Sequence, residues 1–242
     1  MIDIHSHLLN QVDDGPLSLP ESLVLMQQAY ENGVTDIIAT PHSWAFAGEK
    51  NIKWLQERFD NFQKEAQTIP IQLYLGMEHA VDDYRRFVRK IDKEGLLTLA
   101  NSRYVLVEAM RLKSVDEAEE FVYEMKLRGY FPILAHPERM SMVKKDTSIV
   151  RAFRKAGGYA QVTIEACDPR DSGMFHKSAM SLLKEKQIDF LATDMHGLIR
   201  NCKNLASVIK RIEDYTGKEF VDEVTLINPK KVLLDQEIIK RR

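Results

Sequence analysis

Short apolar runs alternate with longer amphipathic stretches along the whole chain. Each run is too short for a buried helix, and most are rich in β-branched or aromatic residues, which predicts buried strands. The runs cover residues 2–5, 36–40, 71–76, 104–107, 131–135, 159–164 and 188–193. Strands that alternate with helices form parallel sheets with right-handed crossovers. The pattern is therefore compatible with a barrel or with an open, doubly wound sheet.

Capping residues mark the ends of the intervening helices. Ser18 with Glu21, and Ser114 with Glu117, have the spacing of a capping box, and glycines stand where several helices are expected to end. The predicted helices lie within residues 18–33, 51–67, 114–129, 147–157, 176–186 and 203–215. No Gly/Ser/Pro-rich linker interrupts the alternation, so residues 1–242 are predicted to form one domain.

Composition narrows the class of protein. The chain has 242 residues, 44% of them hydrophobic and 29% charged, and its net charge of −2 argues against a generally basic nucleic-acid binder. Two cysteines cannot build a disulfide framework and suit a reducing compartment. The opening MIDIHSH does not resemble a secretory signal, and no apolar run approaches the ~20 residues of a membrane helix. A cytoplasmic enzyme or binding domain is expected.

Histidines and carboxylates follow six of the predicted strands. The carboxyl ends of parallel strands open on one face, where active sites form. With one aspartate from the first loop, the candidate metal ligands are His5, His7, Asp14, His42, Glu78, Glu108, His136, Asp194 and His196. One ion takes four to six ligands, so this set predicts two or three divalent ions. Nitrogen and oxygen donors without thiolate favour manganese, iron or zinc over calcium or magnesium.

Neighbouring metal ions suit one reaction class in particular. Paired cations activate water and hold the oxygens of an in-line displacement, typically at phosphorus. Arg139 and Arg200 follow two of the candidate ligands closely and could contact phosphoryl oxygens, although each could instead form a surface salt bridge. A cysteine-dependent tyrosine phosphatase is excluded, because Cys167 and Cys202 do not begin a Cys-x5-Arg motif.

Six short motifs carry a family resemblance. They are HSH at 5–7, VDDGP at 12–16, ATPH at 39–42, GME at 76–78, AHPER at 135–139 and TDMH at 193–196. With them, residues 1 to about 234 resemble the polymerase and histidinol phosphatase (PHP) superfamily. More narrowly, they resemble the bacterial capsule and exopolysaccharide tyrosine-protein phosphatases of the CpsB and YwqE type. This resemblance implies a distorted seven-stranded (β/α) TIM-like barrel with a trinuclear, usually manganese-dependent site.

The resemblance also implies how the ligands are shared and which residues bind phosphate. One ion would take His5, His7, Glu78 and Asp194. A second would share Glu78 and add Glu108 and His136. A third would take Asp14, His42 and His196. Arg139 matches the family's phosphate-binding arginine, whereas Arg200 lies one residue nearer to the preceding histidine than the family's second arginine.

The implied substrate is the phosphorylated tyrosine-rich tail of a bacterial tyrosine kinase that controls polysaccharide export. A basic rim for such a tail is one interpretation of Arg85, Arg86, Arg89, Lys90 and Lys93; a solvated helix face is the other. The chain departs from the family pattern at residues 78–80 and 163–168. In the second stretch, Glu165 and Asp168 would add negative charge near the phosphate. These departures leave the choice of substrate open. A small-molecule phosphatase, a phosphodiesterase and a low-turnover phosphopeptide-binding regulator remain alternatives, and the oligomeric state is not predicted.

Overall fold

The structure, a computed structural model, describes residues 1–45, 51–94, 97–168, 170, 173–197 and 200–239. This part of the chain contains eight strands, seven of which overlap the predicted ones. They are β1 (Ile2–Ser6), β2 (Asp36–Ala39), β3 (Gln72–Leu75), β4 (Glu78–Ala80), β5 (Tyr104–Glu108), β6 (Phe131–Ala135), β7 (Tyr159–Thr163) and β8 (Phe190–Ala192). The predicted alternation of strands and helices is thereby confirmed, with boundaries shifted by one or two residues.

The strands form two parallel sheets. Their orders are β1-β2-β3 and β4-β5-β6-β7-β8, and every strand pair within them is parallel. Two isolated parallel bridges connect the sheets. One joins Ser6 of β1 to Met195 after β8, and the other joins His42, after β2, to Glu78 of β4. The three- and five-stranded sheets therefore replace the continuous sheet that a regular barrel would have.

Strand β4 is absent from the sequence prediction. The strand has three residues, EHA, and such a short, polar segment carries no recognisable strand pattern. Gly76 lies at the break between β3 and β4, where a Cβ atom would come within 2.8 Å of the side chain of Leu99. The glycine permits this close approach, and the break allows β3 to pair with β2 while β4 pairs with β5.

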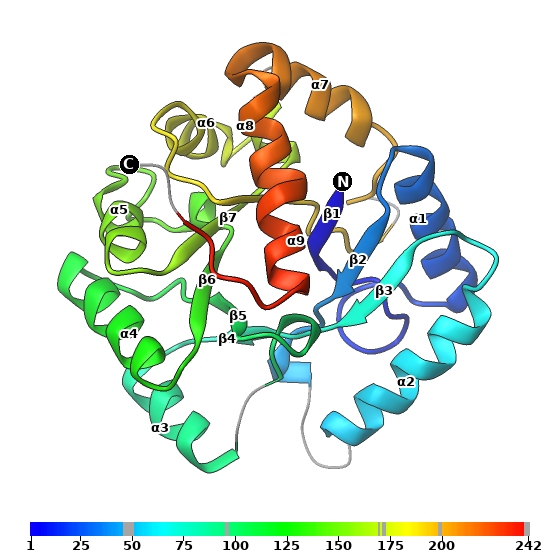
Figure 1. Ribbon diagram of the computed structural model, residues 1–242, viewed down its shortest axis with the longest axis horizontal. Coiled ribbons are helices and arrows are strands. Elements are labelled where there is room, and N and C mark those ends of the chain that lie inside the picture. Colours follow the sequence, from blue (N-terminus) through cyan, green and yellow to red (C-terminus); the bar gives the residue numbers. More distant parts are fainter. Residues whose placement is uncertain (46–50, 95–96, 169, 171–172, 198–199, 240–242) are drawn as a thin grey trace.

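Helices surround the strands (Figure 1). The longer helices are α1 (Leu19–Glu31), α2 (Ile52–Glu65), α3 (Tyr84–Glu94), α4 (Val115–Leu127), α5 (Ser148–Lys155), α6 (His176–Lys184) and α7 (Leu205–Thr216). The side chains of Ser18 and Ser114 accept the N–H of Glu21 and Glu117, as their spacing predicts. Among the described residues, no helix is long and apolar enough to cross a membrane.

Short helical segments connect the main elements. They are η1 (Ser43–Ala45), η2 (Leu99–Asn101), η3 (Pro137–Arg139), η4 (Glu165–Cys167), α8 (Lys218–Asp222), the π-helical turn η5 (Glu223–Ile227) and α9 (Asn228–Leu233). The run from α8 to α9 lies across the strands in Figure 1 and was not predicted from the sequence.

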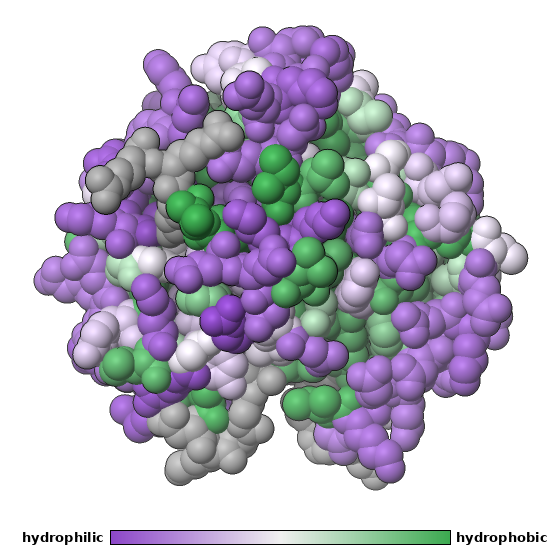
Figure 2. Space-filling model, in the orientation of Figure 1, coloured by the Kyte–Doolittle hydropathy of each residue, from purple (hydrophilic) through white to green (hydrophobic). Residues whose placement is uncertain are grey.

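The C-terminal segment covers the amino ends of the strands. The hydroxyl of Tyr104, at the start of β5, donates to the carbonyl oxygen of Gln236 at 2.8 Å, and that of Tyr159, at the start of β7, donates to Ile238 at 3.3 Å. Val232 of α9 is completely buried with residues of the strands. Figure 2 shows this face filled by side chains, mostly hydrophilic with scattered hydrophobic groups. Access to the strands is therefore left to their carboxyl ends.

Candidate metal centre

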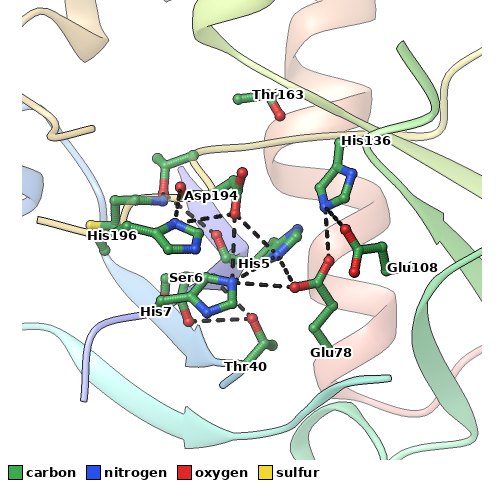
Figure 3. A network of polar contacts seen from close by, with 12 residues as sticks. His5, Ser6, His7, Thr40, Glu78, Glu108, His136, Thr163, Asp194 and His196 are labelled. Carbon is green, nitrogen blue, oxygen red and sulfur yellow. Dashed lines mark hydrogen bonds and ion pairs between the residues drawn. The ribbon is translucent and has the colours of Figure 1, made fainter. Parts of the chain in front are cut away.

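The nine candidate ligands meet at the carboxyl ends of the strands. Figure 3 shows how most of their side chains point toward a common centre, although they come from distant parts of the chain. Four groups bring ligand atoms within 4.8 Å of one another: His7–Asp14–His42–His196, His5–Glu78–His136, His5–His7–Asp194 and His42–Glu78–Glu108. Together these groups contain every ligand that was predicted.

Glu78 lies in the middle of the cluster and is completely buried. Its Oε2 atom is 2.8 Å from Nδ1 of His42 and 3.4 Å from Nε2 of both His5 and His7. Its Oε1 atom is 2.8 Å from Nε2 of His136. Placed at the start of β4, this carboxylate contacts imidazoles that lie in or after three different strands, β1, β2 and β6. Glu108 is more peripheral, since its Oε1 lies 3.9 Å from Nε2 of His136.

Asp194 forms the second convergence point. Its Oδ1 atom lies 3.3 Å from Nε2 of His5, 3.5 Å from Nε2 of His7 and 3.4 Å from Nδ1 of His196. Donors that share one ion at 2.0–2.2 Å are separated by about 3.0–3.5 Å, depending on the coordination geometry. The spacing of His5 and His7 from Asp194 is therefore that of donors arranged about a common ion, whereas Nδ1 of His196 also lies 2.8 Å from the carbonyl oxygen of Asp194.

Asp14 faces the outer side of the cluster. Its Oδ1 atom lies 3.5 Å from Nε2 of His42 and 3.4 Å from Nε2 of His196, and half of its side chain is exposed. The ring of His7 stacks on that of His196 with centroids 3.8 Å apart. This third group is nearest to solvent.

Within the described residues, several buried ligand atoms of the cluster make no well-oriented hydrogen bond. They are Oε2 of Glu78, Oδ1 of Asp194, Nδ1 of His42 and Nδ1 of His136, although Oε2 of Glu78 and Nδ1 of His42 lie only 2.8 Å apart. The Nε2 atoms of His5 and His7 also face each other at 3.2 Å. Buried polar atoms are costly without partners, and lone pairs that converge in this way suit divalent cations. The residues therefore fit a cluster of bound metal ions.

The electrostatics of the cluster point in the same direction. Burial opposes a charge on His7, but hydrogen bonds to Asp13 and Glu78 outweigh it and raise the pKa of His7 to about 10. Burial likewise opposes ionisation of Glu78, yet the charge on His5 and a hydrogen bond from His136 hold the pKa of Glu78 well below its usual value. The proton held by His7 thus balances the charge of the ionised carboxylates where cations are absent, and metal binding would release it.

A second set of residues orients the ligands. Asp13 Oδ2 lies 2.7 Å from Nδ1 of His7 and accepts the N–H of His42 at 2.9 Å. Nδ1 of His5 lies 2.8 Å from Oε1 of Gln161, a completely buried residue of β7. Such partners select the ring tautomer and the ring orientation of a metal ligand. Gln161 was not predicted from the sequence, although a lone amide inside an apolar strand was a usable signal.

Two of the candidate ligands have left-handed backbone. The φ angle is 31° at His136 and 51° at Asp194, and each residue follows the end of its strand. A non-glycine residue in this region costs about 1–3 kcal/mol and persists only where the surroundings enforce it. Such strain is typical of functional sites.

Both predicted arginines reach the cluster. Arg139 and Arg200 donate to the same atom, Oδ2 of Asp194, the latter at 3.2 Å. The Arg139 guanidinium also lies 3.4 Å from Oγ1 of Thr163. Two positive groups therefore border the side of the cluster formed by β6, β7 and the loop after β8.

Two acidic residues depart from the family pattern, Asp168 and Glu165, and they differ from each other in their surroundings. Asp168 does not leave a free charge near the cluster, because Arg211 of α7 binds both of its carboxylate oxygens at 2.8 and 2.6 Å. This hydrogen-bonded pair lowers the pKa of Asp168 to about 2. The expectation of added negative charge was wrong for Asp168; Glu165 is exposed.

We expect Arg211→Met to lower the melting temperature by about 2–4 °C at pH 7. The pKa of Asp168 is depressed in the folded state, so the stabilisation is complete above about pH 4 and is lost as the pH falls toward 2. Thermal unfolding of both proteins at pH 7 and pH 3 measures this loss. Lys210→Met, which breaks an exposed pair with Glu213, is the control. An equal effect of Arg211→Met at both pH values would contradict the prediction.

Other residues noted in the sequence have partners outside the cluster. His79 is buried, and its Nε2 donates to the carbonyl oxygen of Leu97 at 2.9 Å, while burial lowers the pKa of its ring to about 4. In the predicted basic rim, Arg85 bonds Glu120 at 3.0 Å, which favours the interpretation as a solvated helix face. The side chain of Lys93 lies outside the described residues. Burial raises the pKa of Cys167 and Cys202, so neither is suited to act as a thiolate nucleophile.

Known proteins resemble this chain over nearly its whole length. The profile of the family described as capsular polysaccharide synthesis, CpsB/CapC, matches residues 1–234. The chain is 28% identical over 243 residues to the tyrosine-protein phosphatase CpsB of Streptococcus pneumoniae. This alignment covers 98% of this chain and 100% of that protein. The chain is also 27% identical over 247 residues to the tyrosine-protein phosphatase YwqE of Bacillus subtilis. This second alignment covers 100% of this chain and 94% of that protein.

Solved structures agree with the sequence comparisons. A crystal structure from work on YwqE of Bacillus subtilis and CpsB of Streptococcus pneumoniae, described as unique metal-dependent tyrosine phosphatases, superposes with a TM-score of 0.86. It is 26% identical in sequence and covers 100% of this chain and 97% of that chain. A histidinol phosphate phosphatase from Lactococcus lactis, with a TM-score of 0.51 and 16% identity, shares the fold alone. Since the family match covers nearly the whole sequence, this chain belongs to the CpsB/CapC family of capsular polysaccharide synthesis.

Proposed function

We propose that this protein is a metal-dependent protein-tyrosine phosphatase that hydrolyses phosphotyrosine with a metal-activated water. The observation that carries this proposal is the convergence of nine nitrogen and oxygen donors beside two arginines that share one carboxylate. Relatives that match over 94–100% of their length are named tyrosine-protein phosphatases, which supports the same reaction.

The chain's side chains divide into three ligand sets in this proposal. His5, His7, Glu78 and Asp194 hold one ion. Glu78, Glu108 and His136 hold a second. Asp14, His42 and His196 hold a third, with His7 close to the same group. Bound divalent cations supply a water of lowered pKa and neutralise the charge of phosphoryl oxygens.

The two arginines complete the binding of the phosphate. Arg139 presents a guanidinium that is about one-fifth exposed, already oriented by Asp194 and Thr163. A guanidinium binds two phosphoryl oxygens in parallel and stabilises the charge that develops on them. Arg200 is more exposed, and among the described residues its side chain makes one hydrogen bond, to Asp194. We therefore expect Arg200 to contribute less than Arg139 to phosphate binding.

The finer features of the proposal follow from the sequence and the site. We assign manganese as the working ion, with iron or zinc as alternatives for the same donors. Residues 1–242 act as one domain in which β3 and β4 count as a single interrupted strand of a distorted seven-stranded barrel. The substrate is the phosphotyrosine tail of a bacterial kinase for capsule or exopolysaccharide synthesis. The buried free cysteines suit the reducing cytoplasm.

Removal and return of metal tests the proposal. Protein treated with chelator is expected to release no phosphate from a phosphotyrosine peptide, and manganese is expected to restore release, because the donors alone supply no activated water. Phosphate release and metal content are measured together, with iron and zinc in parallel. His136→Ala is expected to stay inactive after refilling, whereas His176→Ala, which changes a histidine outside the cluster, keeps its activity.

Three results would contradict the proposal. Absence of release with intact metal content would exclude a tyrosine phosphatase. Faster hydrolysis of a small phosphoester than of the peptide would indicate a small-molecule phosphatase. Tight peptide binding without release would indicate a regulatory binding protein.

A further inference from the structure

One aromatic side chain is stacked on the outer side of the metal centre. Trp44 lies in η1, and its ring is 4.9 Å from that of His42 between centroids, with 28° between the ring planes. It is 56% exposed, and it is not among the described hydrophobic residues that pack in the core. Core packing therefore does not explain a large apolar surface at this position.

The backbone around Trp44 is held in place by hydrogen bonds. The N–H of His42 donates to Asp13 at 2.9 Å, and the N–H of Ala45 donates to the carbonyl oxygen of His42 at 3.1 Å. The hydroxyl oxygen of Ser43 accepts the N–H of Ala80 at 3.0 Å, which connects η1 to the end of β4. An aromatic ring on such a support loses little conformational freedom when a ligand binds.

The indole lies close to the donor cluster. His42 contacts Glu78 at 2.8 Å and Asp14 at 3.5 Å, so the indole is separated from the donor cluster by a single imidazole. In an aryl phosphate, the aromatic ring begins one bridging oxygen away from phosphorus. The aryl ring of a phosphate bound at the cluster would therefore lie just outside the donors, as the indole does.

The positive and aromatic groups approach the cluster from different strands. Arg139 and Arg200 follow β6 and β8 and contact Asp194, whereas Trp44 follows β2 and stacks on His42. A phosphate monoester that is held by the arginines can therefore extend its organic group toward Trp44.

We propose that Trp44 packs against the aryl ring of the substrate and favours aryl over alkyl phosphate monoesters. The inference rests on the proposed phosphatase function and defines its substrate class. Aromatic pairs prefer offset or edge-to-face packing, which adds to the burial of apolar area. Loss of one apolar contact of this kind changes discrimination between substrates about tenfold.

Kinetics of the manganese-loaded enzyme test the proposal. We compare kcat/KM for phenyl phosphate with that for glycerol phosphate, which has no ring. Trp44→Ala is expected to lower the ratio of these two values about tenfold, and Trp44→Phe to keep it within about threefold of the wild type. Tyr123→Ala, which removes an aromatic residue that is 60% exposed on α4, is the matched control and should leave the ratio unchanged.

A binding measurement provides an independent readout. In a Trp54→Phe background, Trp44 is the remaining tryptophan, because the chain has two. Benzylphosphonate, which is not hydrolysed, is expected to change its fluorescence, and ethylphosphonate at the same concentration is not. Both experiments use the full chain with its metal content measured.

The outcomes separate this inference from the proposed function. Equal losses toward both phosphates in Trp44→Ala, with reduced metal content, would show that the indole only positions His42 and would overturn the inference. An unchanged ratio would also overturn it. If the wild type hydrolyses neither phosphate, the proposed function fails, and the fluorescence response to benzylphosphonate still decides whether Trp44 contacts an aryl group.

Discussion

Glu78→Gln is expected to lower phosphate release about 10³-fold or more. The Glu78 carboxylate contacts four histidines through its two oxygens and is completely buried. Glutamine retains the size of the side chain but removes its charge and one acceptor oxygen. A metal ion typically contributes several kcal/mol to stabilising the transition state, and about 4 kcal/mol corresponds to the expected loss.

Metal content distinguishes a lost ligand from a misfolded protein. Metals per chain, measured after refilling with manganese and desalting, are expected to fall in Glu78→Gln, while circular dichroism stays that of the wild type. Glu165→Gln is the matched control, since it makes the same change at an exposed glutamate outside the donor cluster. Full metal content with a rate within tenfold of the wild type would exclude Glu78 as a shared ligand.

Arg139→Ala is expected to lower kcat about 10²–10³-fold with metal content retained. The guanidinium contacts Asp194 and Thr163 and lies on the side of the cluster where a phosphoryl group would be held. Removal of one preorganised donor from a charge-stabilising site costs about 2.7–4 kcal/mol, which sets this range. Steady-state kinetics with a phosphotyrosine peptide give kcat and KM separately, and the larger loss is expected in kcat.

Conservative and neighbouring variants sharpen this measurement. Arg139→Lys keeps the positive charge but loses the planar pair of donors, so an intermediate rate is expected. Arg200→Ala is expected to cost about tenfold or less, because the Arg200 side chain is 41% exposed and makes a weaker contact with Asp194. A rate for Arg139→Ala within threefold of the wild type would reduce Arg139 to an ion-pair partner of Asp194.

The amino-acid pattern by itself determined the alternation of strands and helices and the set of residues at the strand ends. Seven strands and the capped starts of α1 and α4 follow from periodicity and capping, which depend on neighbours a few residues apart. Parallel topology then implies that groups following different strands meet at one edge. All nine candidate ligands were therefore identifiable before any coordinates.

Only the tertiary structure decided which of these groups face one another. The contact between Arg211 and Asp168 spans 43 residues, and that between Arg139 and Asp194 spans 55. Strand β4 owes its existence to pairing with β5, and the cover over the amino ends comes from the C-terminal segment. The exposure of Trp44 beside His42 also depends on how η1 bonds to β4. These features depend on burial and on partners distant in sequence, whereas a local pattern records only the preferences of its own segment.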